Sequence, residues 1–137
     1  MKYSSYLPRA IESTLNDLLM SFPVVVLTGA RQTGKTTLVE HLAASKGRLF
    51  RTLDDPVSLD LAVRDPKMLL AEAGKLTLDE VQRRPELLLE IKRDVDNNRV
   101  PGRFLLTGSA NLHMMKAVAD SLAGRAVYLH LRPLTEH

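Results

Sequence analysis

The stretch that decides the fold is a polar segment with a glycine at its start and a second glycine before a lysine: Gly29-Ala30-Arg31-Gln32-Thr33-Gly34-Lys35-Thr36-Thr37. It follows an apolar run, residues 24–27, which is short and rich in valine and therefore predicts a buried strand. Leu38, Val39 and Leu42 come next at helical spacing. A strand, a loop that reads Gly-x-x-x-x-Gly-Lys-Thr and a helix together form a phosphate-binding loop, the P-loop.

Each residue type in this loop has a reason to hold phosphate. We expect Gly29 and Gly34 to take positive φ, so that successive loop N–H groups can point at an anion. The helix that follows adds the partial positive charge of its N-terminus. Lys35 should reach the β- and γ-phosphates, the Thr36 hydroxyl should ligate Mg²⁺, and Thr37 should donate near the α-phosphate. The alternative is a chance match in a glycine-containing turn, which the complete motif in this context disfavours.

Length and composition narrow the class of protein. The 137 residues suffice for one domain with its own core, so residues 1–137 are interpreted as a single domain. The aromatic content of 4% disfavours a base-stacking platform for single-stranded nucleic acid. The absence of cysteine excludes disulfides, iron–sulfur clusters and thiolate zinc sites. No apolar run approaches the length of a membrane span and no signal peptide opens the sequence, so a cytoplasmic chain without membrane contact is expected.

The rest of the sequence alternates between the two kinds of secondary structure. Further strands are predicted at residues 49–53, 76–80, 104–109 (running into a polar turn) and 126–131. Helices are predicted at residues 7–22, in two short pieces within 57–73, from about 85 to 97, and at 112–122. Asp55 and Asp65, each before a proline, are expected to cap the two short helices, and Gly47 is expected to end the helix after the loop. Strands that alternate with helices imply an α/β fold: a mostly parallel five-stranded sheet covered on both faces, which makes three layers.

Polar side chains should meet at the carboxyl ends of these strands, where ligands bind in such sheets. Asp79 ends an apolar strand and fits the acid that holds Mg²⁺, while Glu80 fits a general base that activates water for attack on the γ-phosphate. The alternative is that the two acids only cap the next helix. Thr107 or Ser109 could bind the attacking water or the γ-phosphate, with Asn111 in the same role, or these residues could simply form a turn and a helix cap.

Basic residues outside the loop leave two interpretations open. Arg125 could reach the γ-phosphate of a neighbouring subunit in a homo-oligomer, a role worth about 10³- to 10⁵-fold in rate, or could neutralise the last carbonyls of the preceding helix.

A basic group surrounds the helix that begins near Pro85, and acidic residues lie close to it. We therefore favour a mutually paired, solvated surface over a nucleic-acid patch. The basic residues are Arg83, Arg84, Lys92, Arg93, Arg99 and Arg103.

Six segments resemble, in the same order, motifs of the AAA-like ATPase domain in bacterial and archaeal proteins that carry a DUF4143 domain, the AAA_14 group. The segments are Thr28-Gly29-Ala30-Arg31-Gln32-Thr33-Gly34-Lys35-Thr36-Thr37, Leu53-Asp54-Asp55-Pro56, Leu78-Asp79-Glu80-Val81-Gln82, Leu106-Thr107-Gly108-Ser109-Ala110-Asn111, Ser121-Leu122-Ala123-Gly124-Arg125 and Arg132-Pro133-Leu134. The resemblance implies a P-loop ATPase with sheet order 5-1-4-3-2, residues 79–80 as its Walker B pair, and residues 107–111 as a sensor. Such proteins continue into a long C-terminal region, so turnover by these 137 residues alone is expected to be low.

The sequence therefore predicts Mg²⁺-dependent binding of ATP or ADP, with ATP hydrolysis. Lys35, Thr36 and the loop amides would hold phosphate and metal, Asp79 would position the metal, Glu80 would activate water, and Thr107 and Arg125 would assist. A nucleotide-gated binding module without appreciable turnover, or a nucleic-acid-associated motor or loader domain, are the alternatives. A GTPase is disfavoured because no Asn-Lys-x-Asp segment for reading guanine is present.

Overall fold

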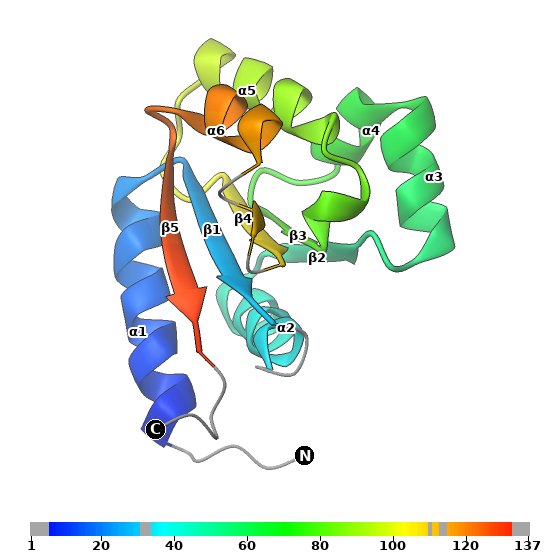
Figure 1. Ribbon diagram of the computed structural model, residues 1–137. Coiled ribbons are helices and arrows are strands. Elements are labelled where there is room, and N and C mark those ends of the chain that lie inside the picture. Colours follow the sequence, from blue (N-terminus) through cyan, green and yellow to red (C-terminus); the bar gives the residue numbers. More distant parts are fainter. Residues whose placement is uncertain (1–5, 31–33, 110, 113–114, 133–137) are drawn as a thin grey trace.

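The computed structural model describes residues 6–30, 34–109, 111–112 and 115–132, and its helices and strands alternate as the sequence predicts (Figure 1). The strands are β1 (Val24–Gly29), β2 (Leu49–Thr52), β3 (Leu76–Asp79), β4 (Phe104–Gly108) and β5 (Ala126–Leu131). The α-helices are α1 (Tyr6–Ser21), α2 (Lys35–Lys46), α3 (Pro56–Arg64), α4 (Pro66–Leu70), α5 (Leu87–Asn97) and α6 (Lys116–Leu122), and a short 3₁₀-helix, η2 (Val81–Arg83), follows β3.

The strands form one sheet in the order β2-β3-β4-β1-β5, and every neighbouring pair is parallel. This is the predicted order 5-1-4-3-2 counted from the other edge, so that prediction is confirmed. Because all strands run the same way, their carboxyl ends lie along one edge of the sheet. The carboxyl ends of β3, β4 and β1 are therefore neighbours at that edge, as expected for the candidate site.

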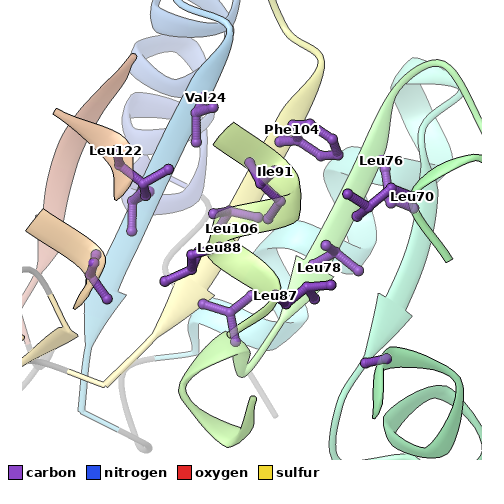
Figure 2. Close-up of a cluster of buried hydrophobic side chains, with 14 of the residues drawn as sticks. Val24, Leu70, Leu76, Leu78, Leu87, Leu88, Ile91, Phe104, Leu106 and Leu122 are labelled. Carbon is purple, nitrogen blue, oxygen red and sulfur yellow. The ribbon is translucent and has the colours of Figure 1, made fainter. Parts of the chain in front are cut away.

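Helices cover both faces of the sheet, which confirms the three layers (Figure 1). Side chains alternate along the interior strand β1: Val25 and Leu27 pack against α1 and α2, while Val24 and Val26 face the side of α5 and α6. Figure 2 shows this second core, in which Ile91 of α5 lies over β4. All four of these valine and leucine residues are fully buried, and full burial of such a side chain contributes about 1.5–3 kcal/mol.

Local signals in the sequence place several helix ends correctly. Asp55 accepts a hydrogen bond from the backbone N–H of Ser58 and caps α3, and Asp65 caps α4 in the same way, in each case directly before a proline. Gly47 ends α2 in the left-handed conformation, with φ 69°. Within the described ranges, no helix combines the length and the apolar character needed to cross a membrane.

The last helix differs from its prediction. Residues 112–122 were expected to be helical, but α6 begins only at Lys116, because Met115 has an extended backbone with ψ 129°. Leu112 lies outside the helix and is completely buried against Gly108. Burial of Leu112 beside the end of β4 keeps this part of the connection in a turn, and composition alone gave no sign of it.

Candidate functional site

The phosphate-binding loop connects β1 to α2, as predicted. Gly34 directly precedes α2 with φ 84°, so the positive end of the helix lies at the end of the loop, where it favours an anion. The prediction of positive φ is therefore confirmed for Gly34 but wrong for Gly29, which is the last residue of β1 and still stands opposite Leu131 of β5. Ala30 is exposed, and Thr37 is exposed in the first turn of α2. The remaining loop residues, Arg31, Gln32 and Thr33, lie outside the described residues.

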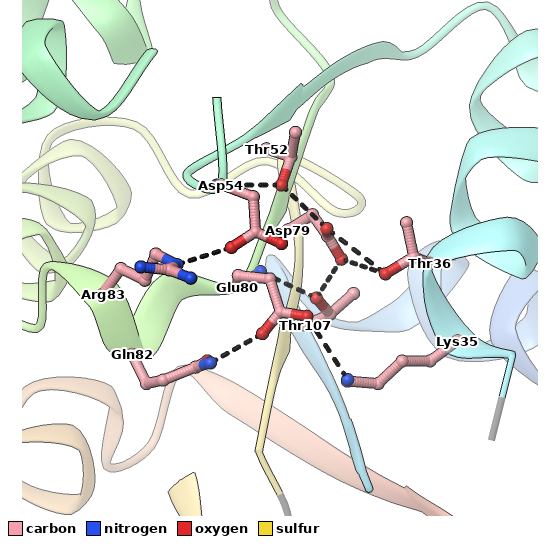
Figure 3. Close-up of polar contacts among 9 residues, drawn as sticks. All are labelled: Lys35, Thr36, Thr52, Asp54, Asp79, Glu80, Gln82, Arg83 and Thr107. Atoms are coloured by element: carbon pink, nitrogen blue, oxygen red, sulfur yellow. Dashed lines mark hydrogen bonds and ion pairs between the residues drawn. The ribbon is translucent and has the colours of Figure 1, made fainter. Parts of the chain in front are cut away.

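Lys35, the first residue of α2, is buried and turns toward β3. Only 2% of its surface is exposed, and its Nζ lies 3.6 Å from Oε2 of Glu80 (Figure 3). An ammonium group inside the protein requires a partner, because its burial alone is unfavourable. Glu80 supplies that partner here, so a phosphate bound in the loop would compete with Glu80 for Lys35.

The Asp79 carboxylate lies at the centre of a set of hydroxyl groups (Figure 3). Thr36 donates to it from α2, at 3.1 Å from Oδ1 and 3.3 Å from Oδ2. Thr52 donates from the end of β2 at 2.9 Å, and Thr107 donates from β4 at 2.6 Å. Mg²⁺ prefers such hard oxygen ligands, and the paired hydroxyl and carboxylate of Thr36 and Asp79 fit its binding.

Glu80 has an unusual backbone. Its φ of 60° places it in the left-handed region. Among the described residues, Glu80 is the only one other than glycine whose φ is positive. Its N–H donates to the Thr107 hydroxyl at 3.0 Å, and its carboxylate accepts from Nε2 of Gln82 at 2.6 Å. The Glu80 side chain makes no hydrogen bond that caps η2. It points toward Lys35 instead, which disagrees with the alternative that it only caps a helix.

Sequence reasoning missed three side chains at this edge: Thr52, Asp54 and Gln82. Carboxylate oxygens of Asp54, Asp79 and Glu80 lie within 4.8 Å of one another. Asp54 is also paired with Arg83, whose Nε is 2.5 Å from Oδ1. Asp54 could have been found by the argument used for Asp79, because it too directly follows a predicted strand at the carboxyl edge of the sheet.

The Thr107 hydroxyl at the end of β4 links the two acids. The Thr107 side chain is fully buried between them, donating to Asp79 and accepting from the N–H of Glu80. Ser109 and Asn111 are exposed, and the Ser109 carbonyl accepts from the N–H of Leu112 in the turn. A contact of Thr107, Ser109 or Asn111 with the attacking water or the γ-phosphate stays a prediction.

Arg125 lies at the opposite edge of the sheet. It directly precedes β5, and its guanidinium donates to both carboxylate oxygens of Asp96 at 2.7 and 3.0 Å and to the Ala123 carbonyl at 2.7 Å. The hydrogen bond lowers the pKa of Asp96 and raises that of Arg125. Arg125 is therefore remote from a nucleotide bound to its own chain. The bond to Ala123 agrees with the alternative role at the helix end, and a role on a neighbouring subunit stays a prediction.

The basic group around α5 is mostly paired with acids. Ion pairs join Arg84 to Glu86, Arg93 to Glu90, and Arg103 to Asp94, in addition to the Arg83 pair above. Arg99 donates to the Gly124 carbonyl. The prediction of a mutually paired surface is confirmed for Arg83, Arg84 and Arg93, whereas Arg103 is paired but largely buried and Arg99 bonds a carbonyl.

Comparison with known proteins places the chain in a family. The model of an AAA domain, AAA_14, matches residues 21–137, which include every side chain of the site described above. The chain belongs to this family of AAA domains. The AAA domain is 37% identical over 128 residues to the uncharacterized protein Rv2008c of Mycobacterium tuberculosis and to the uncharacterized protein Mb2031c of Mycobacterium bovis. The match covers 93% of the chain and 29% of each relative, so the chain spans less than a third of their length.

Solved structures confirm the fold of this AAA domain. The P-loop NTPase domain of the sigma-54 transport activator from E. coli is similar with a TM-score of 0.59 and 21% identity, over 98% of this chain and 100% of that one. AMPPCP-bound DnaA from Aquifex aeolicus is similar with a TM-score of 0.56 and 16% identity, over 88% of this chain and 44% of that one. At such identities the likeness shows the fold alone. The DUF4143 region expected from the resemblance stays a prediction.

Proposed function

We propose that the chain is the core of a Mg²⁺-dependent ATPase. One observation carries this proposal: Lys35 and Thr36 of α2 meet Asp79 and Glu80 of β3 directly beside the P-loop (Figure 3). A cation for the phosphates, a hydroxyl and a carboxylate for the metal, and a second carboxylate for water are the groups that nucleoside triphosphate hydrolysis requires. The match to an AAA domain and the P-loop NTPase fold support nucleotide binding by this site.

The residues divide the reaction between them. The loop amides and Lys35 would bind the phosphates. To reach them, Lys35 would break its ion pair with Glu80. Thr36 and Asp79 would hold Mg²⁺, which when bound neutralises charge on the phosphate oxygens. Glu80 would then accept a proton from water while the water oxygen bonds to the γ-phosphorus. The bond from the γ-phosphorus to its bridging oxygen breaks, and ADP and inorganic phosphate leave.

A nucleotide-gated binding module without turnover is the second candidate. It is favoured by the ion pair between Lys35 and Glu80, since that contact occupies the phosphate-binding cation and the proposed base at the same time. Binding of a nucleotide would open the contact and change the position of β3 and η2, which a partner could sense. Saturable binding without phosphate release would distinguish this candidate from the ATPase.

Two variants test the proposed function. Lys35→Ala should abolish ATP binding, because the loop loses its cation, whereas Glu80→Gln should keep ATP binding and slow hydrolysis by about 10²- to 10⁴-fold. Calorimetric titration with ATP and Mg²⁺ measures binding, and phosphate release in the same samples measures turnover. Lys46→Ala, at the exposed far end of α2, serves as the matched control and should change neither.

Either of two results would contradict the assignment. Tight ATP binding by Lys35→Ala would show that the nucleotide lies elsewhere, and an unchanged rate in Glu80→Gln would remove Glu80 from the reaction. Thermal unfolding of each variant separates these outcomes from a loss of structure, because Lys35→Ala leaves the buried Glu80 carboxylate without its cation.

A further inference from the structure

Gln82 makes a short hydrogen bond to the proposed base. Its Nε2 lies 2.6 Å from Oε1 of Glu80, two residues earlier in the chain (Figure 3). The amide group can face the carboxylate only with its nitrogen, because the opposite orientation would bring two acceptor oxygens together at this distance. Hydrogen bonds to a charged acceptor are the stronger ones, so Gln82 restricts the orientation of the Glu80 carboxylate.

The other end of the Gln82 amide is unsatisfied. Its Oε1 is buried and accepts no hydrogen bond from the described residues. This oxygen lies against the end of β4, where a Cβ added to Gly108 would stand 3.2 Å from it. A buried carbonyl without a partner is unfavourable, because it has lost its hydrogen bonds to water. The fold tolerates this cost in order to keep the amide between Gly108 and Glu80.

A second cost lies in the same turn. The backbone of Glu80 is in the left-handed conformation, which residues other than glycine, asparagine and aspartate seldom adopt. This conformation directs its N–H to Thr107 and its carboxylate to Lys35 and Gln82. Strained backbones and unpaired buried polar atoms are uncommon, and their presence in consecutive parts of one turn indicates a functional constraint on Glu80.

We propose that Gln82 is the positioning residue of Glu80, and this inference rests on the proposed hydrolysis of ATP. Once Lys35 turns to the phosphates, Glu80 loses the cation with which it forms an ion pair in the described part of the chain. Gln82 then holds the carboxylate in the orientation in which it accepts the proton of the attacking water. Because the Gln82 amide occupies the space beside Gly108 that a Cβ at that position would enter, it relates the position of Glu80 to the end of β4.

The test is Gln82→Leu, which keeps the size of the side chain and removes both polar atoms. We expect the single-turnover rate of ATP hydrolysis to fall about 100-fold. The dissociation constant for a non-hydrolysable ATP analogue should stay within about twofold, because in the part of the chain that the structure describes the Gln82 amide bonds to Glu80 and not to Lys35 or Thr36. In the Glu80→Gln background the same substitution should leave the residual rate unchanged, since no carboxylate remains to be held. Asn97→Leu removes an exposed amide at the end of α5 and should change neither quantity.

The outcomes separate the inference from the proposed function. A wild-type chain that binds ATP without hydrolysing it, or a Glu80→Gln variant that hydrolyses normally, overturns the ATPase proposal and the Gln82 inference with it. If Glu80→Gln hydrolyses ATP slowly and Gln82→Leu hydrolyses it at the normal rate, the inference about Gln82 is wrong and the proposed ATPase function stands. An equal loss from Gln82→Leu in both backgrounds shows a merely structural role. If Gln82→Leu does not fold, Gln82→Met takes its place.

A measurement without nucleotide tests the contact itself. The chain has two glutamines, Gln32 and Gln82, so the side-chain amide signal of Gln82 in an NMR spectrum is identified by its loss in Gln82→Leu. This signal should shift in Glu80→Ala, which removes its acceptor. An unchanged signal would show that Gln82 does not hold Glu80 and would overturn the inference.

Discussion

The Asp79 carboxylate accepts hydrogen bonds from three threonines that lie 43, 27 and 28 residues away in the sequence. Only 1% of the surface of Asp79 is exposed, and a buried carboxylate without hydrogen bonds would cost several kcal/mol. Hydroxyl donors offset this cost without adding positive charge, so the carboxylate remains attractive to a divalent cation. The acid is thus fixed in one orientation by α2, β2 and β4 together.

Thr107→Val tests this arrangement at the scale of one residue. Valine has nearly the shape of threonine but no hydroxyl group. The substitution therefore removes the hydrogen bond that Thr107 donates to Asp79 and the one that it accepts from the N–H of Glu80. We expect the free energy of unfolding to fall by about 2 kcal/mol, and the affinity for ATP with Mg²⁺ to fall as well. Urea denaturation and calorimetry measure the two effects. Thr14→Val, an exposed threonine on α1, is the control; equal losses in both variants would contradict a special role for Thr107.

At the scale of secondary structure elements, one buried arginine joins the amino ends of the strands. Arg48 donates to the Thr77 hydroxyl at 3.0 Å and the Leu76 carbonyl at 2.9 Å, both in β3, and to the Gly102 carbonyl before β4 at 2.6 Å. Burial, with a further contribution from Arg103, lowers the pKa of Arg48 to about 10, so the side chain is still charged at neutral pH. The guanidinium therefore connects the start of β2 with its neighbours.

Arg48→Met should destabilise the fold and leave the site intact. The substitution keeps an unbranched side chain but leaves two carbonyls and a hydroxyl without their donor, so we expect a loss of about 3 kcal/mol in the free energy of unfolding. Nucleotide affinity should not change at temperatures where the variant is folded, because Arg48 lies at the edge of the sheet opposite the P-loop. Arg93→Met, which removes an exposed ion pair on α5, should cost at most about 1 kcal/mol. A smaller effect from Arg48→Met would be evidence against this connection.

In the molecule as a whole, the candidate site and the contacts of two structural arginines lie at opposite edges of the parallel sheet. Its carboxyl edge collects Lys35, Thr36, Asp79 and Glu80 from α2 and β3, while its amino edge holds Arg48 and Arg125 in contacts that join elements. Any role of Arg125 in hydrolysis therefore requires a second copy of the chain.

Arg125→Ala tests that role. We expect the variant to bind ATP as the unaltered chain does, because Arg125 is remote from the P-loop of its own chain and its pair with Asp96 is exposed. Calorimetry measures the affinity, and phosphate release is followed over a range of protein concentrations. A specific activity that rises with concentration in the unaltered chain and stays flat in Arg125→Ala would establish the role in trans. A changed affinity in dilute samples would contradict the position described for Arg125.

The candidate site was predictable in part from sequence because some of its features are local. The glycines, lysine and threonine of the loop lie close together in the sequence, at positions 29, 34, 35 and 36, and Asp79 and Glu80 end an apolar strand. Gln82 was visible within a motif but had no role, since nothing in the sequence shows that its amide turns back to Glu80. Thr52 and Asp54 were missed because their relation to Asp79 depends on the pairing of β2 with β3.

The sequence by itself determined the alternation of strands and helices, the P-loop between β1 and α2, and the caps at Asp55 and Asp65. Each of these depends on the periodicity or hydrogen bonding of residues that are close in the chain. Only the tertiary structure decided that Lys35 pairs with Glu80, that Arg125 faces away from the loop, and that α6 starts at Lys116. Those features arise from contacts between distant segments, which form once the parallel sheet has brought the ends of its strands together.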